Sequence, residues 1–556
     1  MRLRERLDGM RARSPRPEAP PPRLPPELVR GRIVPALLSE LAAEGGAERT
    51  RAALMALGRI GPLALEGGSD TAAVLVEHLD AADLGVATSA CLALGVQGGP
   101  RAATSLVALL RGDARGQELI GRGRVPEALR AQAAFALGLV GEGCAITDLA
   151  RFVRLELLRV LDDPATALDL RAAVVIALGA TGGVGDGSEQ VVGRLEAVLR
   201  HEREDDLVRA QAATSLGALL EGEPRGEVRA RVMTTLLALL ARDDLSIPVR
   251  QGALLALGDL ASRSAEELDR RARSALWEAT GRGDRAGRAF ALLALARVAS
   301  RSALAAGETP ELDARAEAEV ARETEQRLRA LLAEGKALVR PWAALALGWL
   351  GWEARAQGGR LEPETRAVLE RCLSRERSAE VAPALALAAG LGAADGAGRT
   401  LLERVPRRAD GSYAALALGF LGHTEAVPAL HLELRAADHE PLRLWRAASA
   451  LALLRDAELV PELLAILAQC ACDTSSVTLA FTLGHTGDVR VVEPLLAMLA
   501  DPRASQRKRA WASYALGLAA DRRPVPWIAR YATRVDYLAA TPSLWSPFGG
   551  GLLEER

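Results

Sequence analysis

Apolar residues recur along this chain in one short pattern, and polar segments separate the copies. The clearest copy, around Leu347, reads Arg-Pro-Trp-Ala-Ala-Leu-Ala-Leu-Gly-Trp-Leu-Gly. Self-similarity at intervals of roughly 30–45 residues indicates a repeat architecture. We count about 13 copies, which begin near Arg51, Thr88, Arg130, Arg171, Arg209, Arg250, Arg288, Arg340, Ala384, Ser412, Arg446, Thr478 and Arg509.

Each copy is predicted to be the second helix of a helical pair, helix A followed by helix B. Helix A is clearest in the segments that begin at Val427, Val460 and Val492, where a proline fits the first helical turn. Helix B is apolar on nearly every side, which is typical of a helix enclosed in a stack. No alternating strand pattern occurs, so the sequence predicts an all-α solenoid.

A glycine near the end of helix B marks each repeat. Inside a helical turn this glycine costs about 1 kcal/mol relative to alanine, and its predicted benefit is close approach of the next repeat. Ala296, Ala388 and Leu454 are expected to take its place in three repeats. The marker glycines are Gly58, Gly95, Gly138, Gly179, Gly217, Gly258, Gly348, Gly419, Gly484 and Gly517.

The paired pattern resembles bacterial HEAT repeats, in particular the short HEAT-like variety named after phycobiliprotein lyases. The resemblance implies a right-handed superhelix whose B helices line the concave face, and a scaffold or adaptor role. It also implies a ladder of Asp and Arg side chains between repeats, for which Arg171, Arg340 and Arg509 at the start of helix B are candidates. A concave arginine stripe that binds an acidic partner is the alternative.

The repeat pattern divides the chain into three predicted segments. Residues 1–32 form an arm rich in Arg and Pro that cannot bury a core and is expected to be disordered. The solenoid is expected over 33–526, and residues 527–556 form a C-terminal cap and aromatic tail.

Composition narrows the class of partner. The residues are 49% hydrophobic but only 3% aromatic, and the formal net charge is −1. A near-neutral chain argues against nucleic acid or an anionic membrane as the main partner. Five scattered cysteines favour no disulfide framework. Without a long apolar run or a signal sequence, we expect a cytoplasmic protein without a membrane span.

No catalytic or cofactor site can be assembled from the sequence. HEAT-like deoxyhypusine hydroxylases hold two irons with four His-Glu pairs, whereas only His201-Glu202 and His439-Glu440 occur here. The glycine-rich stretch at Thr181 lacks the lysine of a phosphate loop. We therefore expect neither enzyme activity nor a metal, cofactor or small-molecule substrate.

Two regions are candidates for binding a partner protein. Trp349 and Trp352 end the repeat that follows an acidic insert, although packing against the next repeat would also explain them. Arg507 and Arg509 belong to a basic stretch at the C-terminal end.

The aromatic tail is the second part of that C-terminal region. Trp527 and Tyr531 are expected to seal the last repeat. Trp545 and Phe548 fit either a docking peptide or a segment that folds back on the repeats.

The function that these features favour is a non-catalytic HEAT-repeat scaffold that binds protein. Two alternatives remain open at this stage. One is a nucleic-acid-binding protein similar to HEAT-like DNA-alkylation glycosylases, and the other is a lyase or chaperone for bilin attachment.

Overall fold

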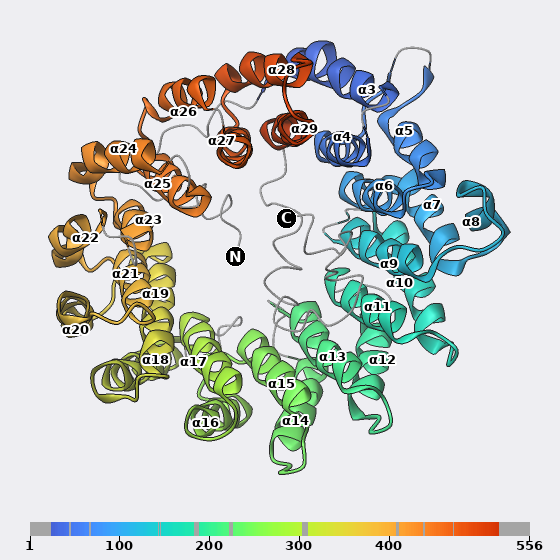
Figure 1. Cartoon of the computed structure of the whole chain (residues 1–556). Coiled ribbons are helices and arrows are strands. Elements are labelled where there is room, and N and C mark those ends of the chain that lie inside the picture. Colours follow the sequence, from blue (N-terminus) through green and yellow to red (C-terminus); the bar gives the residue numbers. More distant parts are fainter. Residues whose placement is uncertain are drawn as a thin grey trace. The chain divides into compact units, whose positions relative to one another are not determined.

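The computed structural model is helical throughout the part of the chain that it describes. That part covers residues 24–521 except 44–45, 66–67, 143, 145, 183–187, 222–225, 303–309, 407–410, 438–439 and 471. Within it there is no β-strand, only an isolated bridge between Ala64 and Asp70. The predicted all-α solenoid is confirmed (Figure 1).

The helices form 13 successive A–B pairs, as the repeat count predicts. Helix A of the repeat that ends with Trp349 and Trp352 is a single helix of 25 residues, α18. The first seven pairs are α3 (Val34–Ala42) with α4 (Ala47–Ile60), α5 (Thr71–Glu77) with α6 (Leu84–Gln97), α7 (Gly99–Arg111) with α9 (Glu127–Gly141), α10 (Thr147–Asp162) with α11 (Leu168–Ala180), α12 (Ser188–Arg200) with α13 (Asp206–Leu219), α14 (Glu227–Leu240) with α15 (Ile247–Leu260), and α16 (Glu267–Gly281) with α17 (Arg285–Ser300). The other six are α18 (Pro310–Glu334) with α19 (Arg340–Ala356), α20 (Pro363–Arg375) with α21 (Ala382–Leu391), α22 (Gly398–Arg404) with α23 (Gly411–Leu421), α24 (Val427–Ala436) with α25 (Pro441–Leu453), α26 (Leu459–Gln469) with α27 (Asp473–Thr486), and α28 (Val492–Ala500) with α29 (Gln506–Ala520).

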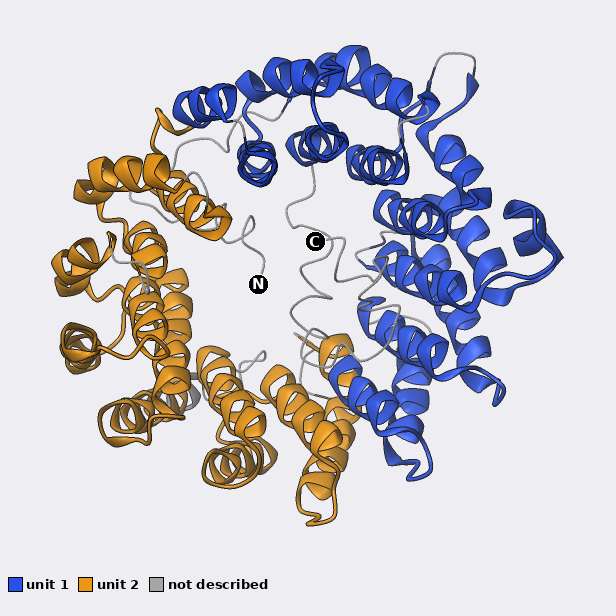
Figure 2. Cartoon of the chain, viewed as in Figure 1, with its two compact units in different colours: residues 1–215, 460–556 blue, residues 216–459 orange. Residues whose placement is uncertain are grey.

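The helices divide into two compact units (Figure 2). Unit 1 contains the chain up to Ser215 and from Val460 onward, and unit 2 contains Leu216–Leu459. Within each unit the B helices stack side by side and the A helices form a second row along one side of them. We call the other side of the B helices, turned away from the A helices, the B face.

Marker glycines make the repeats approach closely, as predicted. A Cβ on Gly58 would lie 2.8 Å from the Cα of Ala93, which is closer than a Cβ can pack. In general the marker meets a small residue two positions before the next marker. Gly348 meets Ala388, so the next marker is Gly390, two residues later. Gly390 in turn meets Ala417, two residues before Gly419. The marker of this repeat is therefore Gly390 and not Ala388, as the sequence analysis expected. By the same register, Gly419 meets Ala450, which places the next marker at Ala452 instead of Leu454.

The last repeat stacks directly on the first within unit 1. A Cβ on Gly517 would overlap the Cα of Ala56, two residues before the marker Gly58. The contact that joins consecutive repeats therefore also joins α29 to α4, and we call this junction the seam. Trp527 and Tyr531, expected to seal α29, lie outside the described residues; the side of α29 that faces α4 is sealed by α4 itself.

The helical region begins earlier than the predicted boundary at residue 33. A short α2 (Pro26–Leu28) continues through a π-helical turn, η1 (Val29–Ile33), into α3. Val29 and Ile33 are buried, so residues 26–32 belong to the first repeat and not to the arm. The proline-rich composition misled the sequence analysis because Pro26 occupies the first turn of a helix, where proline is tolerated.

We expect Gly517→Ala to destabilise the seam by about 1–3 kcal/mol, because the new methyl group must displace the α4 backbone. Hydrogen exchange of the α4 and α29 amides measures this local free energy. Gly193→Ala is the matched control, since Gly193 lies in α12 with no atom near its missing Cβ. That change should stabilise its helix by about 0.5–1 kcal/mol. If Gly517→Ala and Gly193→Ala stabilise their helices equally, α29 does not pack closely on α4.

Candidate functional site

Arginines at the start of the B helices hold helix A to helix B. Arg171 Nη1 donates to the carbonyl oxygen of Leu161 at 2.8 Å, and Arg509 Nε donates to that of Leu499 at 2.8 Å. Each therefore satisfies a carbonyl at the C-terminal end of helix A, where a cation is also favoured by the helix dipole. Other repeats make the same contact through Arg209 and Arg250.

Two arginines at the start of helix B also reach the next repeat, as the ladder prediction requires. Arg171 lies 2.7 Å from Glu204, and Arg340 lies 3.0 Å from Glu376. The acidic partners are thus glutamates in the following inter-helix segment. Two aspartates upstream of helix B instead accept from backbone amides within their own turns: Asp163 from Ala165 and Asp501 from Arg503.

At the seam, Arg509 pairs with the first repeat instead of a following one. Its Nη2 lies 2.8 Å from Oε1 of Glu40, whose Oε2 accepts from Arg49 Nε at 2.6 Å. Glu40 is only 5% exposed, so both arginines neutralise a buried carboxylate. Arg507 lies 3.5 Å from Glu48 at the exposed rim of the seam. The two arginines proposed as partner-binding residues thus both make contacts within the chain.

A second polar cluster crosses the seam and was missed by the sequence analysis. Arg59 donates to the hydroxyl of Tyr514 at 2.6 Å and pairs with Asp521 at 3.4 Å. All three side chains are buried. No periodicity in the sequence could have found this cluster, because it joins residues from opposite ends of the chain.

The two tryptophans proposed to bind a partner, Trp349 and Trp352, differ in how far they are buried. Trp352 is 7% exposed and packs edge to face against Phe420, with ring centroids 5.7 Å apart. It is therefore part of the core of unit 2 and does not offer its ring to a partner. Packing against another repeat, the alternative given in the sequence analysis, explains it. Trp349 is half-buried and lies on the B face of α19.

Trp349 belongs to a larger aromatic surface on the B face of unit 2. A helical period places Trp342 and Trp349 on the side of α19 opposite the fully buried Leu347. The Arg446 guanidinium lies 3.7 Å from the ring centroid of Tyr413. We call this surface the aromatic face; its half-buried residues are Phe290, Leu293, Trp342, Leu345, Trp349, Leu387, Tyr413 and Trp445.

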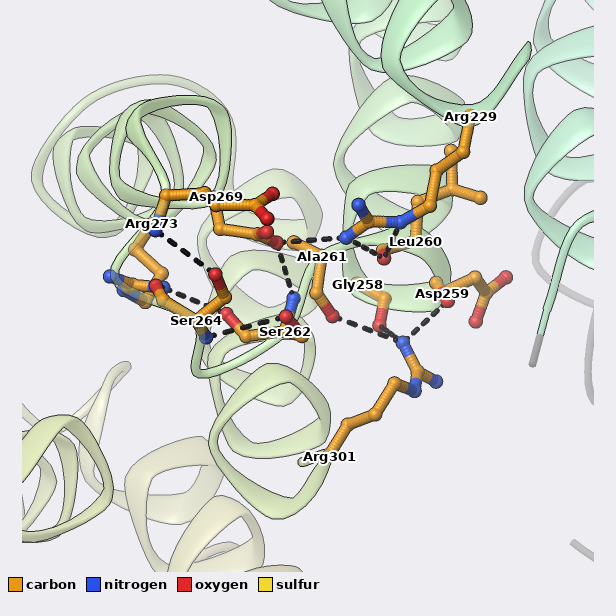
Figure 3. Close-up of polar contacts among 11 residues, drawn as sticks. Arg229, Gly258, Asp259, Leu260, Ala261, Ser262, Ser264, Asp269, Arg273 and Arg301 are labelled. Carbon is orange, nitrogen blue, oxygen red and sulfur yellow. Dashed lines mark hydrogen bonds and ion pairs between the residues drawn. The ribbon is translucent and has the colours of Figure 1, made fainter. Parts of the chain in front are cut away.

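Unit 2 also contains a buried polar cluster around the end of α15 (Figure 3). Asp269, 0% exposed, accepts from Arg229 Nη2 at 2.9 Å and from the Ser262 amide at 2.7 Å. Arg229 also donates to the Leu260 carbonyl at 2.8 Å. These contacts satisfy the exposed carbonyls of a helix end and fix the loop that follows it.

Two further arginines complete this cluster. Arg273 donates to the Ser262 and Ser264 carbonyls at 2.7 and 2.8 Å, and Arg301 donates to the carbonyls of Gly258 and Ala261 at 3.1 and 3.2 Å (Figure 3). Burial lowers the pKa of both guanidinium groups. Because their donors point at backbone oxygens, the cluster holds the loop and is not arranged as a ligand site.

Neither a metal site nor a membrane span is found in the described ranges. No group of three or more His, Cys, Asp or Glu residues there could hold a metal ion. No helix of that part is both long and apolar enough to cross a membrane. His201 follows α12 at an exposed position, whereas His439, Trp545 and Phe548 lie outside the described residues.

No family model and no curated protein matches this chain. Solved structures that match this chain include an engineered protein, at 17% identity over 80% of this chain and 98% of that one, with a TM-score of 0.29. Human deoxyhypusine hydroxylase in complex with glycerol matches at 18% identity over 58% of this chain and 95% of that one, with a TM-score of 0.23.

A third structure comes from work on a phosphorylation switch in the interaction between cadherin and β-catenin. It matches at 13% identity over 81% of this chain and 99% of that chain, with a TM-score of 0.26. Such low scores and identities carry no argument about what this chain does.

Proposed function

We propose that this protein is a non-catalytic scaffold of the HEAT-like type that binds a protein partner through the aromatic face of unit 2. The supporting observation is the concentration of half-buried aromatic rings on one side of successive B helices. Only 3% of the residues are aromatic, yet α17, α19, α23 and α25 each contribute at least one to this face. Tyr, Trp and Phe in partly buried positions are the residues that most often dominate the free energy of protein binding.

The nucleic-acid alternative has less support. It rested on the basic C-terminal stretch, but Arg509 pairs with Glu40 and Arg507 with Glu48. Phosphate binding by these arginines would have to replace ion pairs that already exist. No observation favours the bilin lyase alternative.

The test is a comparison of partner binding by two variants of the full chain. Trp349→Ser with Tyr413→Ser removes two rings from the aromatic face. Phe152→Ser with Leu155→Ser is the matched control, since these side chains are 38% and 40% exposed on α10 in unit 1. Partners are captured from extracts of the source cell by chemical cross-linking and identified by mass spectrometry.

We expect the first variant to weaken binding of a specific partner by about 30-fold or more, as loss of hot-spot residues does. The control should bind as the unchanged chain does. If both variants retain the same partners with the same affinity, the aromatic face is not the binding surface.

A further inference from the structure

On α4, α6, α9 and α11 of unit 1 the B face differs from the aromatic face, because its side chains are buried. Three residues before each marker glycine, the side chain points toward the B face. On these four helices they are Met55, Leu92, Phe135 and Ile176, which are 0%, 1%, 0% and 5% exposed. At the same position in unit 2, Leu255, Leu293, Leu345 and Leu387 are half-buried, whereas Leu416 is 9% exposed.

The described helices do not account for this burial. Around α6, α9 and α11, packing partners among these helices are the neighbouring B helices and the A helices. No described helix packs on their B face (Figure 2). We call the B face of α4, α6, α9 and α11 the covered face, because its side chains are buried although no described helix packs on it.

Polar groups on and beside the covered face suit an extended peptide. Gln132 and Gln211, six residues before their markers, are 1% and 0% exposed. Nε2 of Gln211 makes no hydrogen bond to any residue of the described part. A buried amide donor needs an acceptor, and the carbonyl oxygens of an extended chain supply one.

We propose that the C-terminal segment 522–556 binds the covered face of its own chain. The last described residue, Asp521, is held at the seam by Arg59 of α4, at the edge of this face. From α29 the path to α11 crosses α4, α6 and α9, roughly 32–40 Å at 8–10 Å per layer. An extended chain of roughly 35 residues spans about 115 Å, so the segment reaches the whole face.

The chemistry of this segment also fits an apolar face. It contains Trp527, Tyr531, Tyr537, Trp545 and Phe548, which can pack on the Met, Leu, Phe and Ile side chains of the covered face. Residues 1–23 are the other chain end outside the described residues. They are rich in Arg and Pro, and the named side chains of the covered face include no carboxylate to pair with them. Unit 1 would then carry its own peptide.

The first experiment replaces Phe548 with the photoreactive residue p-benzoylphenylalanine in the full chain. Irradiation should attach it to α6, α9 or α11, as located by mass spectrometry. A mixture of unlabelled and ¹⁵N-labelled chains distinguishes binding within one chain from binding between chains. Attachment only to another copy, or to none of these helices, would overturn the proposal.

The same photoreactive residue at Pro20 tests the other chain end. If it attaches to the covered face and the probe at Phe548 does not, residues 1–23 are the occupant and the proposal is wrong.

A second experiment measures thiol accessibility and does not depend on where a probe is placed in the tail. In Ile176→Cys, alkylation of the new thiol should accelerate at least about tenfold when Trp545 and Phe548 are both changed to Ala, as expected for loss of a protecting segment. Leu345→Cys is the matched control at the same repeat position in unit 2, and its rate should not change. An unchanged rate at Ile176→Cys, or equal acceleration at both thiols, would reject the proposal.

Discussion

Replacing Glu40 with Ala is expected to lower the local free energy of unfolding of the seam by about 3–5 kcal/mol. Glu40 is 5% exposed and accepts hydrogen bonds from both Arg49 and Arg509. Its removal leaves two guanidinium groups without their buried counter-charge, and an uncompensated buried charge is strongly destabilising. Hydrogen exchange of the α4 and α29 amides, read by mass spectrometry, measures the loss where it occurs.

An exposed ion pair at the same junction is the matched control. Arg32 lies 2.8 Å from Glu493, with side-chain exposures of 56% and 62%. Because water already solvates both charges, Glu493→Ala should cost at most about 1 kcal/mol. A double-mutant cycle with Arg509→Ala isolates the Glu40–Arg509 interaction. If Glu40→Ala and Glu493→Ala have equal effects, the buried carboxylate does not stabilise the seam.

The second large effect is expected at Asp269 in unit 2. Asp269→Ala removes the acceptor of Arg229 and of the Ser262 amide, both of which are buried. We expect a local loss of about 3–5 kcal/mol, because a buried guanidinium loses its charge partner and an amide loses its acceptor. The loop that follows α15 and the first turn of α16 should exchange their amide hydrogens faster.

Asp395→Ala is the control for this prediction. Asp395 lies 3.1 Å from Arg360, and both side chains are 61% exposed. Its loss should cost less than about 1 kcal/mol. If the loop amides between α15 and α16 exchange as slowly in Asp269→Ala as in the unchanged chain, then Arg229, Arg273 and Arg301 hold the loop without the carboxylate.

The sequence reveals the arginine ladder, to which Arg509 of the seam belongs, but not the Asp269 cluster. Each ladder arginine is visible because it recurs at the start of helix B, and its contact with the carbonyl of helix A is local, as for Arg171 with Leu161. Its acidic partner was assigned wrongly, because aspartates in a turn compete for backbone amides. Asp269 does not belong to the recurring pattern, which therefore gives no sign of its contacts with Arg229 and Ser262.

Trp349 and Trp352 also show that contacts between distant repeats cannot be predicted from the sequence. In the structure Trp349 is half-buried on the side of α19 opposite the buried Leu347. For Trp352 the sequence left binding and packing open, because its burial depends on Phe420, which belongs to another repeat. Sequence spacing determines which side of a helix a residue occupies, but not whether a distant residue covers that side.

By itself the sequence determined the all-α repeat, its 13 units and the purpose of the marker glycine, because each depends on interactions within one repeat or between neighbours. Only the tertiary structure decided that α29 packs on α4, so that Arg507 and Arg509 meet Glu48 and Glu40. The physical reason is that the marker of the last repeat is a glycine, like the markers of most other repeats. Its sequence specifies a small residue opposite it, which Ala56 supplies, but not which repeat must provide that residue.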